Sequence, residues 1–418
     1  MNPLNAIPFL KRLQNGAALA VMCCVALPPG CDGNAEQRAL NESLNSRVGA
    51  AMRDIMKRND IPGGSIAVSH DGMLVFRSGY GRADANSGAA ATVDTLFRIG
   101  AVSTALTGAA ILKQFEAELP EALDYRVFGG AALLPDAAFP DWLPRRDRRV
   151  TDIRLRDLLL NTSGWQTDDD DPYADLAGIA RAMGATAPAN ARTVAGYMLR
   201  QRRLDADPAS KAQPGSFGYN LLGRIVEYRS GMPYAQAMQQ LVLQPTGAVG
   251  MRIAGADAAS RLPNEATYYD RPGTRPVLAQ DGSQRRGAPA YTGYVFSTAD
   301  AQAGWVATPT DLVRFATGLG GNESVTPLLQ KKTLALMASR DQRLPDSPYS
   351  PGWDLRSEGG VTILQRSGPL PTGSYAFLQT RDDGWTWAVA FNRMPDQADI
   401  ATAIAELEAA VVGASAQQ

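Results

Sequence analysis

The sequence predicts a mixed α/β (α+β) domain in which an antiparallel sheet is built from both ends of the chain and flanked by helices. β-rich runs occur near the start and near the end of the chain, and the long middle part has the pattern of helices and loops. With 418 residues and 45% hydrophobic residues, the chain can bury a large core. We expect the domain to span residues 35–413, with a mostly helical subdomain inserted into the sheet at about residues 101–340.

The first part of the domain is predicted to be a helix followed by a hairpin. Between residues 35 and 61 apolar residues recur at helical spacing: Leu40, Leu44, Val48, Ala51 and Ile55. Residues 65–68 and 73–76 are rich in β-forming types, and Ser69-His70-Asp71-Gly72 between them is typical of a turn. Because His70 is the single histidine of the chain and lies in this turn, we expect no Ser-His-Asp triad.

The last part of the domain is predicted to complete the sheet. Residues 361–364, 375–380 and 385–391 form strand-like runs, and the last two flank the turn signal Arg381-Asp382-Asp383-Gly384. A final helix is expected over residues 396–412, with Asp396 or Asp399 as its N-cap. Its apolar stripe consists of Ile400, Ile404, Leu407 and Val411.

Charge and cysteine content exclude several function classes. Lys and Arg number 41 and Asp and Glu number 42, so a net charge of -1 gives no reason to expect a nucleic-acid partner. The three cysteines, Cys23, Cys24 and Cys31, all precede the predicted domain. The domain therefore has neither a disulfide nor a cysteine-ligated metal, and we expect no metal and no cofactor.

Residues 1–31 have the pattern of a signal peptide. Lys11 and Arg12 precede an apolar run over residues 17–27, which is too short to span a bilayer comfortably. This pattern predicts export to the periplasm. Cys31 is followed by polar residues, as at a bacterial lipoprotein junction, although the prolines before it depart from that pattern. Lipid attachment at Cys31 and ordinary signal cleavage both remain open, and membrane attachment is expected only through the N-terminus.

A series of short motifs identifies a family. They are, in chain order, Ile61-Pro62-Gly63-Gly64, Leu96-Phe97-Arg98-Ile99-Gly100, Leu155-Arg156-Asp157-Leu158-Leu159-Leu160-Asn161-Thr162-Ser163-Gly164, Gly218-Tyr219-Asn220-Leu221-Leu222-Gly223, Ala307-Thr308-Pro309-Thr310-Asp311-Leu312 and Arg366-Ser367-Gly368. From about residue 61 to residue 392 the sequence resembles the serine β-lactamase and penicillin-binding-protein family, in the branch of class C β-lactamases, D,D-carboxypeptidases and esterases. The resemblance implies a β-lactamase/transpeptidase-like fold, but a fold by itself does not settle function.

The resemblance places the family's catalytic Ser-x-x-Lys pair at Ala101 and Thr104. In an active member, three residues make nearly one helical turn, so the lysine amine lies beside the serine hydroxyl and activates it. An alanine methyl group cannot attack a carbonyl, and a threonine hydroxyl is a poor proton acceptor near neutral pH. A shifted register does not help, because Leu106 stands three residues after Ser103.

Three further catalytic devices of the family are altered. The segment that carries the family's Tyr-x-Asn is missing before Gly218, and Tyr219 matches a later tyrosine with a structural role. The Lys/His-Thr/Ser-Gly triplet matches Arg366-Ser367-Gly368, whose guanidinium stays protonated; it can bind an anion or simply lie at a strand edge. In the oxyanion hole Ala101 can still donate its N–H, but Pro369 has none at the second position.

The sequence therefore predicts an exported pseudoenzyme that binds a ligand or partner, such as a cell-wall peptide or a small acyl or amide compound. The residues expected to line its remnant pocket are Ala101, Ser103, Tyr219, Arg366, Ser367 and Gly368. The alternative is a serine hydrolase of the β-lactamase, D,D-peptidase or esterase type with a rewired site that uses Ser103, Ser163 or Ser216. A purely structural scaffold cannot be separated from the pseudoenzyme at this level.

Overall fold

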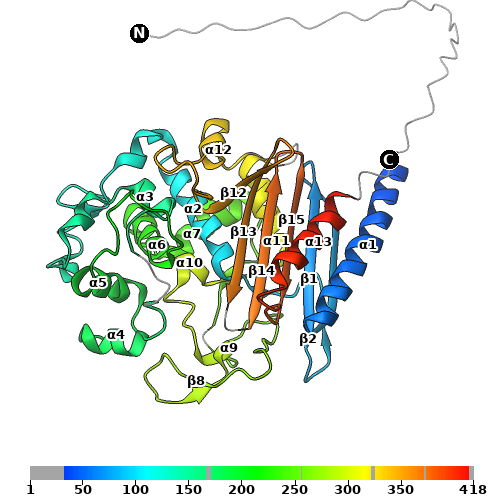
Figure 1. Cartoon of the computed structure of the whole chain (residues 1–418), viewed down its shortest axis with the longest axis horizontal. Coiled ribbons are helices and arrows are strands. Elements are labelled where there is room, and N and C mark those ends of the chain that lie inside the picture. Colours follow the sequence, from blue (N-terminus) through cyan, green and yellow to red (C-terminus); the bar gives the residue numbers. More distant parts are fainter. Residues whose placement is uncertain (1–32, 166–170, 256, 322–324, 371–372, 414–418) are drawn as a thin grey trace, which may run out of the picture.

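The central element is an eight-stranded sheet whose strands come from both ends of the chain (Figure 1). Its strands are β1 (Gly63–His70), β2 (Met73–Asp84), β3 (Ala89–Ala90), β11 (Tyr349–Ser350), β12 (Trp353–Glu358), β13 (Val361–Leu370), β14 (Ser374–Arg381) and β15 (Trp385–Phe391). They lie in the order β11-β12-β13-β14-β15-β1-β2-β3, and neighbours pair antiparallel. The last strand of the chain, β15, pairs with the first, β1, so the predicted sheet from both chain ends is confirmed.

The computed structural model describes residues 33–165, 171–255, 257–321, 325–370 and 373–413. The predicted signal segment, residues 1–31 with Cys31, lies outside the described residues and stays a prediction. Among the helices that are described, none is both long enough and apolar enough to cross a membrane.

The two faces of the sheet are covered by different helices because successive side chains of a strand point to opposite faces. On β1, Ile66 and Val68 pack with α1 (Gly33–Arg58) and α13 (Ile400–Val412), which lie together on one face in Figure 1. Ala67 between them joins the main core, which also contains α2 (Ser103–Gln114) and α11 (Pro309–Gly320). The sheet is therefore buried on both sides.

A largely helical region lies on one side of β13, and α1 and α13 lie on the other side (Figure 1). Its helices are α3 (Leu155–Leu159), α4 (Leu176–Ala182), α5 (Ala191–Gln201), α6 (Ser216–Ser230), α7 (Tyr234–Met238), α8 (Gln244–Thr246), α9 (Pro289–Thr292), α10 (Asp300–Ala303) and α12 (Lys331–Met337). Short strands join them: β4 (Phe97–Arg98), β5 (Phe128–Gly129), β6 (Leu134–Pro135), β7 (Arg252–Ile253), β8 (Val277–Leu278), β9 (Arg286–Gly287) and β10 (Trp305–Ala307). One helix within the predicted insertion, α11, packs back on the sheet against β1, β14 and β15.

The start of the predicted final helix differs from the structure. The final helix begins at Ile400, and Asp399 occupies its N-cap position, but the Asp399 side chain makes no capping hydrogen bond to the helix backbone. The Asp399 carboxylate instead accepts hydrogen bonds from Arg58, at 2.8 Å, and from Asn59. Asp399 thus joins the ends of α1 and α13, an interaction between distant segments that overrides the local cap preference.

Candidate functional site

Ala101, which stands at the position of the family's nucleophile, lies where β13 meets the start of α2. Ala101 belongs to the short turn η1 (Gly100–Val102), which directly precedes α2. Gly100 has a φ of +52°, and a Cβ atom there would lie 2.8 Å from the Gly368 carbonyl oxygen. A Cβ atom on Gly368 would lie 2.0 Å from the Ile99 carbonyl oxygen. Two glycines therefore let strand and turn pack backbone against backbone, and this places the Arg366-Ser367-Gly368 triplet beside Ala101, as the resemblance implies.

Thr104, at the position of the family's lysine, is tied down by backbone acceptors. Its hydroxyl lies 2.8 Å from the Ala101 carbonyl oxygen and 3.2 Å from the Gly352 carbonyl oxygen. The residue is 3% exposed. A hydroxyl has a single proton to donate, and the two neighbouring acceptors are both carbonyls. Thr104 therefore fixes the start of α2 and offers no base to a reacting group.

Ser103, a candidate substitute nucleophile, is sealed inside the core. It is 0% exposed, and its Oγ lies 3.4 Å from the backbone nitrogen of Trp305 on β10. The Ile99 backbone nitrogen donates to the Trp305 carbonyl oxygen at 3.0 Å, so η1 and β10 are held together on this side. Ser103 contributes to that joint rather than to an open pocket.

The Tyr219 hydroxyl is used by the backbone on both sides. It donates to the Leu159 carbonyl oxygen and accepts from the Gly352 N–H, each at 2.9 Å. Burial raises the pKa of Tyr219 to about 12, so the phenol stays neutral at physiological pH. Tyr219 therefore joins α3, α6 and the start of β12 and is not a free proton carrier.

Arg366 is neutralised by a residue that the sequence motifs did not single out. Its Nη1 lies 2.7 Å from Oδ1 of Asp354 on β12, and its Nε donates to the Ala101 carbonyl oxygen at 3.3 Å. The arginine side chain is 16% exposed and the aspartate side chain 29% exposed. A signal for this pairing exists in the sequence: Gly359-Gly360 is a hairpin turn, and the resulting register brings Asp354 opposite Gln365.

Ser367, unlike Gly368, does not join Arg366 beside Ala101. The Ser367 hydroxyl lies 3.0 Å from the Tyr375 hydroxyl, and Tyr375 belongs to the core beneath α1 and α13. Ser367 thus lies on the face of β13 away from Ala101. Pro369 is exposed and, as a proline, offers no N–H. Of the residues predicted to line the pocket, the structure brings together Ala101, Arg366 and Gly368, and Tyr219 adjoins them through Gly352.

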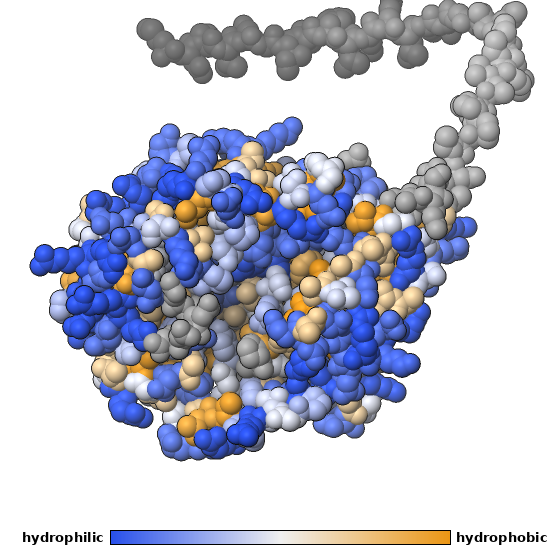
Figure 2. Space-filling view, viewed as in Figure 1, coloured by the Kyte–Doolittle hydropathy of each residue, from blue (hydrophilic) through white to orange (hydrophobic). Residues whose placement is uncertain are grey.

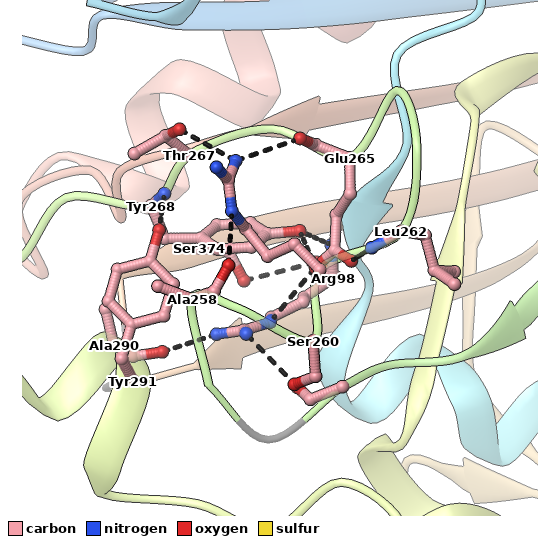
Figure 3. Close-up of polar contacts among 12 residues, drawn as sticks. Arg98, Ala258, Ser260, Leu262, Glu265, Thr267, Tyr268, Ala290, Tyr291 and Ser374 are labelled. Atoms are coloured by element: carbon pink, nitrogen blue, oxygen red, sulfur yellow. Dashed lines mark hydrogen bonds and ion pairs between the residues drawn. The ribbon is translucent and has the colours of Figure 1, made fainter. Parts of the chain in front are cut away.

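A buried cation holds the strand that leads into η1 (Figure 3). Arg98 on β4 is 0% exposed, and its Nε lies 3.5 Å from Oε1 of Glu265, which is also buried. Its guanidinium lies over the ring of Tyr268 at 4.2 Å and over that of Phe296 at 4.4 Å, and it donates to the carbonyl oxygen of Ala290. Arg98 therefore ties the loop between β7 and α9 to the strand that positions Ala101.

Figure 2 shows a largely hydrophilic face that is hollowed where the helical half meets the sheet. Among the described residues, no group of three or more His, Cys, Asp or Glu side chains is arranged to hold a metal ion. The described groups around Ala101 can donate hydrogen bonds but include no nucleophile paired with a base.

Comparison with known proteins gives consistent matches over most of the chain. A family model described as Beta-lactamase matches residues 48–411. The esterase EstB of Burkholderia gladioli is 27% identical over 336 residues, which cover 74% of this chain and 78% of EstB. A D-aminopeptidase of Gluconobacter oxydans (strain 621H) is 24% identical over 383 residues, which cover 90% of this chain but only 63% of the aminopeptidase. The solved structure of the D-amino acid amidase from Ochrobactrum anthropi SV3 has a TM-score of 0.64 at 20% identity, with 89% of this chain and 99% of the amidase covered.

Proposed function

The chain belongs to the β-lactamase family, and from this premise we propose that it is a catalytically inactive member that binds its ligand without turning it over. The observation that carries the proposal is the state of the four catalytic positions. Ala101 has no nucleophile, Thr104 is bonded to two backbone carbonyls, Arg366 is paired with Asp354, and Pro369 lacks an N–H. Each change removes a different part of the acyl-transfer machinery.

The ligand class follows from the relatives. Their names, an esterase and a D-aminopeptidase, indicate acyl groups and amino-acid amides. We therefore propose that the remnant site takes a cell-wall peptide or a small acyl or amide compound. The N–H of Ala101 can still donate to a carbonyl group, whereas the covalent step has no atom to perform it.

The test is activity-based labelling of the purified protein. A fluorescent penicillin, a chromogenic cephalosporin and a short-chain nitrophenyl ester should give neither covalent label nor turnover above the background of the Ala101→Gly variant. Ligand binding is then measured by calorimetry with acyl-D-alanyl amides. Turnover that disappears when a single serine is replaced would sink the proposal.

A second candidate is a hydrolase with a rewired site, because the relatives with esterase and aminopeptidase names align over most of this chain. It requires Ser103, Ser163 or Ser216 as nucleophile. Ser103 is fully buried and Ser163 is 6% exposed, so both would need local opening before they could meet a substrate. Alanine variants of the three serines, assayed with the same substrates, distinguish the two candidates.

We also propose that the protein is exported to the periplasm, because residues 1–31 have the pattern of a signal peptide. Fractionation should then recover the protein from the periplasm, either soluble or with the membrane. If Cys31 carries a lipid, Cys31→Ser moves the protein from the membrane to the soluble fraction, whereas ordinary cleavage predicts no difference between the two forms.

A further inference from the structure

A pocket of about 280 Å³ lies apart from Ala101, between α3 and the segment that joins α12 to β11. Its lining residues are Leu123, Arg156, Leu159, Leu160, Leu336, Ser339, Arg340, Asp341, Gln342, Arg343 and Pro351. Four leucines and a proline supply an apolar surface, and the remaining residues are polar or charged. The pocket thus combines an apolar body with a few polar groups, as small-molecule sites commonly do.

The charged lining is predominantly cationic. Three arginines, Arg156, Arg340 and Arg343, face a single carboxylate, that of Asp341. Arg343 is paired with two acids: its Nη2 lies 2.7 Å from Asp341 and 3.0 Å from Asp157, a buried residue that does not line the pocket. Burial acts to raise the pKa of Asp341, but hydrogen bonds from Arg343 outweigh it and leave the pKa lowered, so Asp341 stays ionised.

The other two arginines keep unused donors. Arg156 pairs with Asp124, whose side chain is 54% exposed, so water screens that interaction. Arg340 has no carboxylate partner among the described residues; its Nη1 donates to the Ser347 carbonyl oxygen at 2.9 Å and its Nη2 to the Leu355 carbonyl oxygen at 3.2 Å. A guanidinium has five N–H groups, so Arg340 retains donors that these two carbonyls do not use.

We propose that this pocket binds a small organic carboxylate with a compact apolar body. The carboxylate matches the N–H groups that Arg340 and the adjacent Arg156 do not use within the protein, and the apolar body matches the leucine surface. A volume of about 280 Å³ corresponds to roughly nine water molecules of about 30 Å³ each, which suits a ligand the size of benzoate and excludes a folded partner. The inference is independent of the remnant site, because none of the lining residues is a catalytic position.

The test is isothermal titration of the full chain with three probes: benzoate, benzamide and inorganic phosphate. Benzoate should bind, benzamide should bind at least tenfold more weakly because it lacks the charge, and phosphate should not displace benzoate because it lacks the apolar body. Equal binding of benzoate and benzamide, or no binding of benzoate, overturns the proposal.

Matched variants locate the site. Arg340→Gln should weaken benzoate binding at least tenfold, and Ser339→Trp should block the exposed rim of the pocket. Arg314→Gln, on the exposed side of α11 and outside the pocket lining, should bind benzoate as the natural chain does. Circular dichroism checks that each variant is folded. Equal benzoate affinity in Arg340→Gln and Arg314→Gln contradicts the assignment, whatever the activity at the remnant site.

Discussion

The Thr104 and Tyr219 hydroxyls and the Arg366 guanidinium, all near Ala101, form hydrogen bonds that stabilise the fold. Thr104 and Tyr219 both bond to Gly352, one to its carbonyl oxygen and the other to its N–H. Arg366 reaches both Asp354 and the carbonyl of Ala101. In each case a polar group at a family position has found a partner inside the protein. Replacing the lost serine therefore does not recreate the surroundings that would activate it.

The first residue-level prediction concerns the double variant Ala101→Ser/Thr104→Lys. We expect no measurable hydrolysis of the cephalosporin or the nitrophenyl ester, because the Tyr219 hydroxyl is already bonded, Arg366 cannot give up its proton and Pro369 supplies no oxyanion donor. Loss of one such donor alone costs about 3 kcal/mol of transition-state stabilisation. A turnover well above that of the Thr104→Lys single variant would show that these three positions matter less than we infer.

The second residue-level prediction is the cost of removing the Tyr219 hydroxyl. Tyr219→Phe leaves the Leu159 carbonyl and the Gly352 N–H without their partner in a buried place. We expect a loss of about 2 kcal/mol in the free energy of unfolding, measured by urea denaturation. Tyr228→Phe is the matched control, because Tyr228 is 49% exposed and should change stability by less than about 0.5 kcal/mol. Similar losses in both variants would contradict this role.

At the scale of elements, β13 shows how a strand can extend past a polar run and a proline. The sequence pattern predicts a strand over residues 361–364 only, but β13 continues to Leu370. Its pairing with β12 ends at Gln365, whereas its pairing with β14 continues through Pro369 opposite Tyr375. Beyond Gln365 one edge of β13 has no partner in β12, so a proline there need not interrupt a ladder.

The element-level prediction concerns the turn η5 (Arg148–Asp152). Asp147 is its N-cap: the carboxylate accepts from the backbone N–H of Arg149, and from that of Leu204 at 3.2 Å. Hydrogen bonds from the Arg149 side chain hold the pKa of Asp147 down to about 2. A lowered folded-state pKa means that the contribution to stability is complete above the unfolded pKa of about 4 and is lost as the pH falls towards 2.

The variant Asp147→Asn should therefore be less stable at pH 7 by about 1 kcal/mol, because a neutral amide loses the ion pair with the partly exposed Arg149. It should also lose less stability than the natural chain between pH 4 and pH 2. Urea denaturation at pH 7, 4 and 3 measures both effects. Asp94→Asn is the control, since Asp94 is exposed. A pH profile of Asp147→Asn parallel to that of the natural chain would contradict the assignment.

At the scale of the whole molecule, Arg98 joins the sheet-proximal strands to the helical region. Its ion pair with Glu265 is removed from water on both sides, and three aromatic rings lie within 5.4 Å of its guanidinium carbon. The Ser374 hydroxyl donates to the Arg98 carbonyl oxygen at 3.2 Å, so β14 also contacts this residue. Elements distant in sequence thus meet at one residue.

The whole-molecule prediction is that Arg98→Met destabilises the chain by about 3–5 kcal/mol, because Glu265 is left as an unpaired buried charge. The double variant Arg98→Met/Glu265→Gln should recover part of that loss. Arg314→Met, at an exposed position, should change little. Guanidinium denaturation measures all three. A double variant no more stable than Arg98→Met would show that the ion pair is not the source of the effect.

Local patterns by themselves determined much of this protein. The spacing of apolar residues predicted α1, the β1–β2 hairpin, β14, β15 and the sheet made from both chain ends, because burial on one face imposes a period that the sequence must carry. Residue identity alone also determined that Ala101 is no nucleophile and that Pro369 donates no N–H. These conclusions need no tertiary contact.

Only the tertiary structure decided what became of the remaining site residues. Arg366 could have bound an anion, but Asp354 already neutralises it; Ser367 could have faced the pocket, but the alternation of β13 turns it towards Tyr375. The return of α11 to the sheet was likewise not apparent in the sequence pattern. The physical reason is the same in each case: the partner comes from another part of the fold, and packing and register, rather than local propensity, choose it.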